Sequence, residues 1–170
     1  VLSSQNLESN GLEKVGNPIV DFCVQPIDRA VTSVGFQPPT RKHQEVLKLR
    51  PSSIVAVIDI TYYSKEAPVG FAMVYMPHEI LDEGRVDLEN TDSVYEFYSQ
   101  LLASNGIHSD TRLRIVHARE RLADILHIPQ GDPLLILEEE LYTEYDRPVL
   151  SQKLYMGADL YEISLRRKNK

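Results

Sequence analysis

The stretch that decides the fold is LADILHIPQGDPLL, residues 122–135. Its first half predicts the end of a helix over residues 119–126, because its leucines and isoleucine lie at helical spacing. Its prolines and its glycine predict a tight loop. The chain then continues into two predicted strands, residues 134–143 and 149–156, which a turn joins. The stretch therefore marks a helix that leads through a tight loop into a hairpin.

The same order of elements occurs earlier in the chain. Residues 42–49 predict a short helix, residues 54–63 a strand and residues 69–76 the returning strand of a hairpin. Two such units can pair into one antiparallel sheet with pseudo-two-fold symmetry, and helices would cover one face of it. The sequence therefore predicts an α+β fold. Residue types that recur 80 residues later support the repeat: Tyr62 at Tyr142, Pro68-Val69 at Pro148-Val149, and Tyr75-Met76 at Tyr155-Met156.

The other segments carry weaker patterns. Residues 91–103 predict a helix that Asn105-Gly106 closes, and residues 111–118 predict a strand. Three shorter predictions complete the chain: a strand over residues 19–25, a helical turn over residues 28–35 and a last strand over residues 161–165.

The start of the chain differs from the rest in polarity and periodicity. Residues 1–17 are polar with weak periodicity and predict a linker or frayed terminus, which leaves residues 18–170 as the domain. The first residue is Val1 rather than Met. This is expected of a domain trimmed or excised from a longer protein, and N-terminal processing is the alternative.

Composition limits the possible functions. The chain has 170 residues, 42% of them hydrophobic, enough for one domain with a core. Its net charge is −7, and its only basic cluster is residues 166–170, so we do not expect this chain alone to bind DNA tightly. A single cysteine, Cys23, indicates a reducing cytoplasm. No apolar run is long enough to span a membrane, and no signal-peptide pattern opens the chain.

The deciding stretch carries a family resemblance. Residues 122–135 resemble the A-x-x-L-x-I-P-x-G-x-P-L-L segment of the UTRA domain, which is the effector-binding half of HutC-type GntR transcription regulators. The closing segment, Asp146-Arg147-Pro148-Val149 with Tyr155, Asp159 and Tyr161, resembles that family's G-x-P-V … Y-x-x-D-x-Y/F pattern. The likeness runs from about residue 43 to residue 165.

The resemblance implies a chorismate-lyase-like fold with an effector pocket between sheet and helices. It implies a homodimer that senses a small molecule and reaches DNA only through an N-terminal winged helix-turn-helix domain. We expect that domain to be missing here, because 17 linker-like residues cannot form three helices.

Strand alternation proposes which side chains line the pocket. The resemblance implies that phosphosugar-sensing members carry Arg, Glu and Ser at corresponding positions. Here apolar residues stand there instead, which favours a less polar effector; the alternative is that they form plain core. The predicted strand residues of the pocket are Ile60, Tyr62, Ala72, Val74, Leu150, Gln152 and Met156.

Two further pairs are candidate ligand-binding residues. Ser93 and Tyr95 match retained family positions near a helix start, where free N–H groups favour an anion. The alternative is an ordinary first turn with Asp92 as its cap. Arg112 and Arg114 share one face of a strand and could bind an acidic ligand, or they could pair with Glu138 or Glu140.

The resulting prediction is a non-enzymatic regulatory domain with no cofactor. We predict no metal, because the histidines show no ligand spacing and Glu138–Glu140 alternate across a strand. One alternative is a chorismate-lyase-like enzyme using Arg112, Arg114 and one of those glutamates. Another is a standalone ligand-binding protein.

Overall fold

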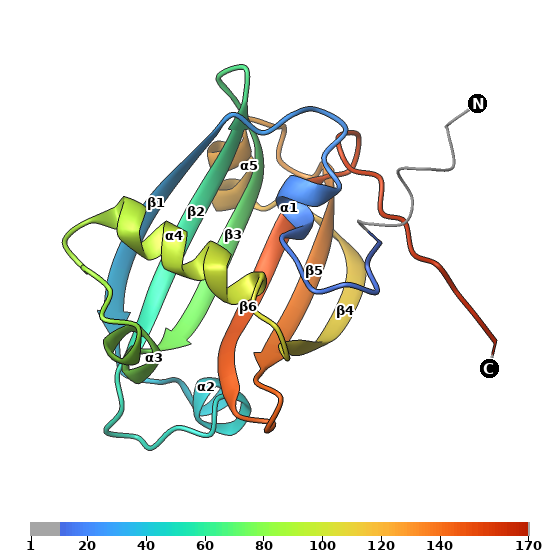
Figure 1. Ribbon diagram of the computed structural model, residues 1–170. Coiled ribbons are helices and arrows are strands. Elements are labelled where there is room, and N and C mark those ends of the chain that lie inside the picture. Colours follow the sequence, from blue (N-terminus) through green and yellow to red (C-terminus); the bar gives the residue numbers. More distant parts are fainter. Residues whose placement is uncertain (1–10, 170) are drawn as a thin grey trace.

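Six antiparallel strands form one sheet in the order β1-β2-β3-β6-β5-β4 (Figure 1). The computed structural model describes residues 11–169. It confirms the α+β class and both predicted hairpins. The strands are β1 (Arg29–Gln37), β2 (Val55–Ser64), β3 (Ala67–Pro77), β4 (His108–His117), β5 (Pro133–Tyr142) and β6 (Pro148–Gly157).

The sheet has the pseudo-two-fold symmetry that the repeat predicts. Strands β1, β2 and β3 form one half, and β4, β5 and β6 form the other in the same order from the edge inward. The halves meet where β3 pairs with β6, and there Met73 lies opposite Lys153. These two residues are each other's counterparts in the 80-residue repeat. A residue that pairs with its own counterpart lies on the symmetry axis, so the axis passes through this pair.

Helices cover both faces of the sheet, so the prediction that they cover one face was wrong. The α4 face carries α1, α3 and α4, and its central side chains include Ile60, Ala72 and Leu154. The opposite α5 face carries α2 and α5, and its side chains include Phe71 and Leu134. The helices are α1 (Pro18–Asp21), α2 (Arg41–Val46), α3 (His78–Glu83), α4 (Thr91–Leu102) and α5 (Glu120–Leu126).

Two hydrophobic clusters explain the two covered faces. The larger lies on the α4 face, where α4 contributes Val94, Tyr98 and Leu102 at every fourth position. The smaller lies under α5, where Phe71 and Leu134 are almost fully buried. Both faces of the central strands are apolar at these points, so a helix on one side alone would leave the other exposed.

The N-terminal predictions were wrong in type. Residues 19–25 begin in helix α1, because Pro18 occupies the first helical position, where proline is well tolerated. Residues 28–35 lie mostly in strand β1, which pairs with β2 along its whole length. Asp28 caps no helix; its carboxylate accepts the N–H of Lys65 in the β2–β3 turn at 2.8 Å. The predicted last strand is reduced to one bridge between Cys23 and Tyr161.

Residues 1–10 of the predicted linker lie outside the described part of the chain, but residues 11–17 contact the domain. Leu12 donates its N–H to the carbonyl of Ser164 at 2.8 Å, and Leu12 and Val15 pack against the larger core. Asn17 is the N-cap residue of α1. Within residues 11–169, no helix has the length and hydropathy needed to cross a membrane.

Candidate functional site

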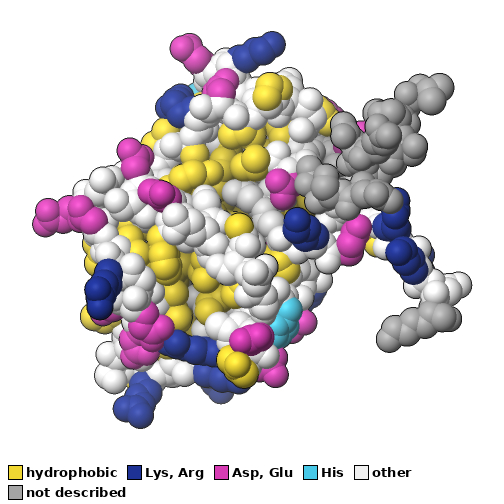
Figure 2. Space-filling view, in the orientation of Figure 1, with side chains coloured by type: hydrophobic (Ala, Val, Ile, Leu, Met, Phe, Trp, Pro, Cys, Tyr) yellow, Lys and Arg dark blue, Asp and Glu magenta, His cyan; other side chains and the backbone are white. Residues whose placement is uncertain are grey.

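The predicted strand residues of the pocket meet in the core beneath α4. Each is at most 1% exposed, and all lie on the α4 face. They pack against each other and against Val94 and Tyr98, while the larger grooves of the surface are lined by other residues. On the visible surface of this face, hydrophobic side chains flank α4 on both sides (Figure 2). The residues brought together are Ile60, Tyr62, Ala72, Val74, Leu150, Gln152 and Met156.

Tyr62 links this core to the N-terminal segment. Its hydroxyl accepts a hydrogen bond from Asn17 Nδ2 at 3.0 Å. Its ring meets Tyr95 edge-on with ring centroids 6.1 Å apart, and Tyr95 in turn lies 6.4 Å from Tyr98. Burial raises the pKa of the Tyr62 hydroxyl well above its ordinary value. The phenol is therefore neutral and serves as a hydrogen-bonding group inside an apolar core.

A chain of hydrogen bonds crosses the α4 face of the second half-sheet. The Tyr98 hydroxyl donates to Gln152 Oε1 at 2.8 Å, and Gln152 Nε2 donates to Glu139 Oε2 at 2.7 Å. The hydroxyl of Thr111 donates to the other carboxylate oxygen of Glu139 at 3.1 Å. Burial raises the pKa of Tyr98, so it too stays protonated. The chain thus joins α4 to strands β6, β5 and β4.

Glu139 was named from the sequence only among the three glutamates of the enzyme alternative, and its place in this hydrogen-bond network was not predicted. It is 5% exposed, and within residues 11–169 it makes no ion pair. A buried carboxylate without a cation costs free energy unless hydrogen bonds surround it. The signal was present in the sequence, because Glu139 alternates with Leu137 and Leu141 and therefore shares their buried face.

The N-terminus of α4 is capped by the side chain of the residue that precedes the helix. Asn90, not Asp92, is the N-cap, and its Oδ1 accepts the N–H groups of Asp92 at 3.1 Å and Ser93 at 3.4 Å. The alternative of Asp92 as the cap was therefore wrong. Ser93 and Tyr95 are half-buried on this helix. An anion bound at the Ser93 N–H would have to displace the Asn90 side chain.

Arg112 and Arg114 lie on the α5 face, away from the buried strand residues, although Arg112 lines the same groove as Gln152. Arg114 makes an ion pair with Glu138 at 2.7 Å, and its hydrogen bond lowers the pKa of that carboxylate. Arg112 lines a groove of about 240 Å³ under α2, together with both acidic and basic side chains. Of the three glutamates named for the enzyme alternative, Glu139 points to the opposite face, whereas Glu138 and Glu140 share the face of these arginines.

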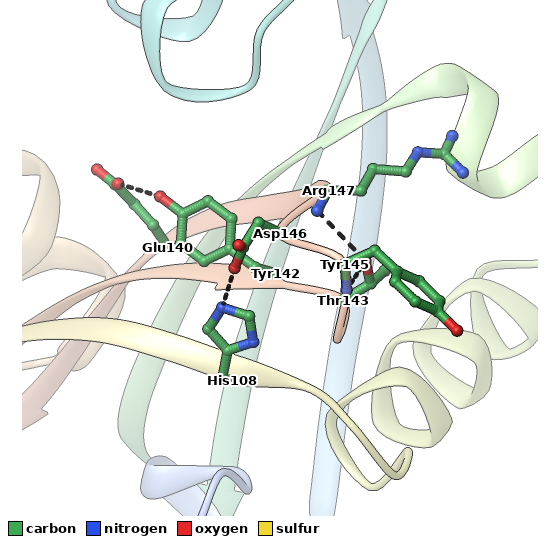
Figure 3. A network of polar contacts seen from close by, with 7 residues as sticks. All are labelled: His108, Glu140, Tyr142, Thr143, Tyr145, Asp146 and Arg147. Atoms are coloured by element: carbon green, nitrogen blue, oxygen red, sulfur yellow. Dashed lines mark hydrogen bonds and ion pairs between the residues drawn. The ribbon is translucent and has the colours of Figure 1, made fainter.

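A second polar network holds the tip of the β5–β6 hairpin (Figure 3). His108 contacts the carboxylate of Asp146 at 2.9 Å, and the Tyr142 hydroxyl donates to Glu140 at 2.9 Å. Burial and this bond to Glu140 raise the pKa of Tyr142 to about 12. The Arg147 guanidinium donates two bonds to Glu83 of α3, at 2.9 and 2.6 Å. These contacts attach the hairpin to its neighbours.

A groove of the described surface lies at the C-terminal end of α4. It measures about 480 Å³ and runs between the segment before α1 and the C-terminal end of α4. None of the predicted pocket residues lines it. Among residues 11–169, no group of three or more His, Cys, Asp or Glu side chains is placed to hold a metal ion.

Known families and structures match this architecture. The UTRA domain model matches residues 27–162. No curated protein sequence matches the chain. The chain resembles a GntR-family transcriptional regulator from Enterococcus faecalis V583, with 22% identity, a TM-score of 0.70, and coverage of 82% of this chain and 100% of that one.

Two further solved structures have similar values. One is the ligand-binding domain of a protein assigned to the GntR family from Bordetella bronchiseptica, with 20% identity, a TM-score of 0.70, and coverage of 82% and 90%. The other is the C-terminal domain of the histidine utilization repressor from Pseudomonas syringae pv. tomato DC3000, with 14% identity, a TM-score of 0.69, and coverage of 83% and 100%. At these identities the likeness establishes the shared fold.

Proposed function

The chain belongs to the UTRA domain family, and from this premise we propose that it is the effector-binding domain of a HutC-type GntR transcription regulator. In this proposal it senses a small cytoplasmic metabolite as a homodimer. DNA is contacted by an N-terminal winged helix domain outside residues 1–170, and the chain itself catalyses no reaction. The observation that carries the proposal is the family match over residues 27–162.

The core beneath α4 supports the sensing role. It is apolar except for the bonded pair Gln152 and Glu139, and Tyr98 connects that pair to α4. A ligand that displaced α4 would have to break or rearrange these bonds, so binding and helix position would be coupled. The apolar strand positions support an effector less polar than a phosphosugar.

A thermal-shift screen of cytoplasmic metabolites tests the sensing role. We expect at least one class of compound to raise the unfolding midpoint by several degrees at saturating concentration, because a ligand that binds only the folded state stabilises it. The Gln152→Leu variant should change the ligand-induced shift, whereas Tyr145→Phe at the exposed hairpin tip should not. If no compound stabilises the protein, the sensing role is wrong.

One of the two edges of the sheet, strand β4, supports dimerisation. Strand β4 pairs only with β5 among the described strands, and it exposes Leu113 by 45% and Ile115 by 70%. Unprotected edge strands tend to pair with another chain. Antiparallel pairing of two β4 strands about Thr111 would place Asp110 of each copy opposite Arg112 of the other. We therefore propose a second copy of this chain as the occupant of this edge.

Sedimentation velocity tests this interface. We expect Arg112→Asp to shift the protein towards monomer, because like charges would then face each other across the pair. The double variant Asp110→Arg/Arg112→Asp restores opposite charges and should recover the dimer. Ile54→Asp, at an exposed position elsewhere, is the control and should leave the dimer intact. A monomeric parent protein, or a dimer indifferent to Arg112→Asp, contradicts the proposed edge.

The absence of catalysis has its own test. Incubation of the protein with chorismate should yield no 4-hydroxybenzoate above the uncatalysed rate. Product formation that depends on Arg112 or Arg114 would favour the enzyme alternative instead.

A further inference from the structure

The groove at the end of α4 is large enough for a small ligand. Its volume of about 480 Å³ falls within the range of about 300 to 1,000 Å³ that is usual for small-molecule sites. Residues far apart in sequence form it, from the segment before α1 and from the α4–β4 connection. It is lined by Lys14, Val15, Gly16, Asn17, Asp21, Ser99, Leu102, Ala103, Ser104, Asn105, Gly106 and Ile107.

The groove combines an apolar floor with separate charges. Val15, Leu102 and Ile107 are half-buried or buried and pack against the main core. Asp21 stands at the rim, and one of its carboxylate oxygens accepts the N–H of Asn17 at 3.1 Å. Lys14 stands at the same rim, yet within residues 11–169 the two side chains form no ion pair shorter than 4 Å. Both charges are therefore open to a ligand.

The surroundings of Asp21 favour a cation. The C-terminal end of α4 carries a partial negative charge, and no basic residue lies in its last turn to offset it. Partial burial raises the pKa of Asp21 in spite of nearby Lys14. An ammonium group beside Asp21 would stabilise its ionised form, which burial disfavours.

We propose that this groove binds a small zwitterion of the amino-acid type. Its ammonium group binds Asp21 and the C-terminal carbonyl end of α4, its carboxylate binds Lys14, and its apolar part lies on Leu102. A simple anion would meet the repulsion of Asp21, and a simple amine would leave Lys14 without a partner. The inference rests on the proposed function and deepens it, because it names the chemical class of the effector and where it binds.

Asn17 connects the groove to the core. It lines the groove, caps α1 and donates a hydrogen bond to the buried hydroxyl of Tyr62 at 3.0 Å. Its Oδ1 is buried and has no hydrogen-bond partner in the structure. A ligand that brings a donor beside Asn17 would satisfy this oxygen and reposition the amide against Tyr62. Occupancy of the groove is thereby transmitted to the aromatic cluster of Tyr62 and Tyr95 beneath α4.

Isothermal titration calorimetry with the individual L-amino acids tests the proposal. We expect at least one to bind. Its decarboxylated amine and its N-acetylated form should each bind at least tenfold more weakly, because each lacks one charge. Asp21→Asn should weaken binding at least tenfold and Lys14→Gln several-fold. Asp21→Asn keeps an acceptor for the Asn17 N–H, so its unfolding midpoint should stay close to that of the parent protein.

Matched variants locate the site. Ala103→Trp should block the groove and abolish binding. Lys48→Gln and Asp146→Asn each remove one charge, positive and negative respectively, from a different groove of about 370 Å³. Both should leave the affinity for the amino acid unchanged. If a metabolite of another class binds and no amino acid does, or if Asp21→Asn binds as well as the parent, this inference is wrong while the proposed function stands. If no small molecule binds at all, both are wrong.

Discussion

The two halves of the sheet have the same backbone arrangement but different interiors. In the first half Ile60 pairs with Ala72, and both are fully buried on the α4 face. By strand register the equivalent pair in the second half is Glu139 with Gln152, which is also buried. Strand β5 follows β2 by 79 residues and β6 follows β3 by 80, so the predicted match of Tyr62 with Tyr142 was wrong and Tyr63 is its counterpart. One half therefore has a purely apolar core pair, and the other has a charged and polar pair at the same depth.

The difference shows what a pseudo-symmetric fold can accommodate. The polar pair is tolerated because Tyr98 from α4 and Thr111 from β4 supply hydrogen bonds at its two ends. The apolar pair needs no such partners. A repeat therefore fixes the backbone of both halves but leaves each free to use its interior differently. Here the bonds of Gln152, Glu139 and Thr111 connect α4 to the second half of the sheet.

The largest expected effect comes from introducing a carboxylate into the first half at Ile60, the position equivalent to Glu139. Ile60→Glu should lower the free energy of unfolding by about 4 kcal/mol or more, because no donor surrounds a carboxylate there. Urea denaturation followed by circular dichroism measures this. Should that variant fail to fold, Ile60→Gln reports the same asymmetry with a smaller loss. A loss below about 1 kcal/mol would mean that the bonds around Glu139 are not what makes it tolerable.

A double-mutant cycle tests the polar pair by replacing Gln152 and Glu139 with leucine, which gives the second half an apolar pair like that of the first. Gln152→Leu alone should cost about 3 kcal/mol, because it leaves both Glu139 and Tyr98 without their partner. Adding Glu139→Leu should recover part of that loss, with a coupling of about 1 kcal/mol or more. Unfolding free energies of the two single variants and the double variant give the coupling. Strict additivity would show that the pair does not act as a unit.

Removing one donor should have a smaller effect. Tyr98→Phe deletes the hydroxyl that donates to Gln152 and should cost about 1 to 2 kcal/mol. Tyr145→Phe, at a tyrosine that is 86% exposed, should cost nothing measurable and serves as the control. Equal stability of both variants would contradict a role for the Tyr98 bond.

The smallest expected effect is a pH dependence of opposite sign in the two halves. Asp59 and Glu138 are equivalent positions that lie opposite Met73 and Lys153, and each contacts an arginine. Burial raises the pKa of Asp59 despite Arg121, whereas the bond from Arg114 lowers the pKa of Glu138. Ionised Asp59 therefore costs stability at neutral pH, and ionised Glu138 contributes it.

Single variants separate these two signs. At neutral pH Asp59→Asn should stabilise and Glu138→Gln should destabilise the protein, each by less than about 1 kcal/mol because both sites are partly solvated. The Asp59 difference should vanish as the pH falls below the ordinary carboxyl pKa, whereas the Glu138 difference should vanish only below the lowered pKa of Glu138 in the folded state. Unfolding midpoints measured between neutral pH and pH 3 check this. The same sign at both sites would contradict the comparison.

The sequence predicted the elements whose patterns are local. Both hairpins, the helix over residues 91–103 and the burial of Ile60, Ala72 and Gln152 follow from strand and helix periodicity. Strand β1 was missed because it is an edge strand stabilised by pairing with β2, and its local signals, Asp28 and Gly35, resemble those of a helix. The separation of Arg112 and Arg114 from the buried strand residues follows from which face α4 covers.

The repeat, the α+β class and the alternation of side chains between the two faces of each strand can be read from the amino-acid sequence. These depend on spacings of two and about four residues, or on the recurrence of whole segments. The tertiary structure alone decided which faces the helices cover, how Asn17 reaches Tyr62, and that residues 14–21 and 99–107 enclose a groove. These depend on contacts between distant segments, which form only when the sheet has brought those segments together, so no local pattern records them.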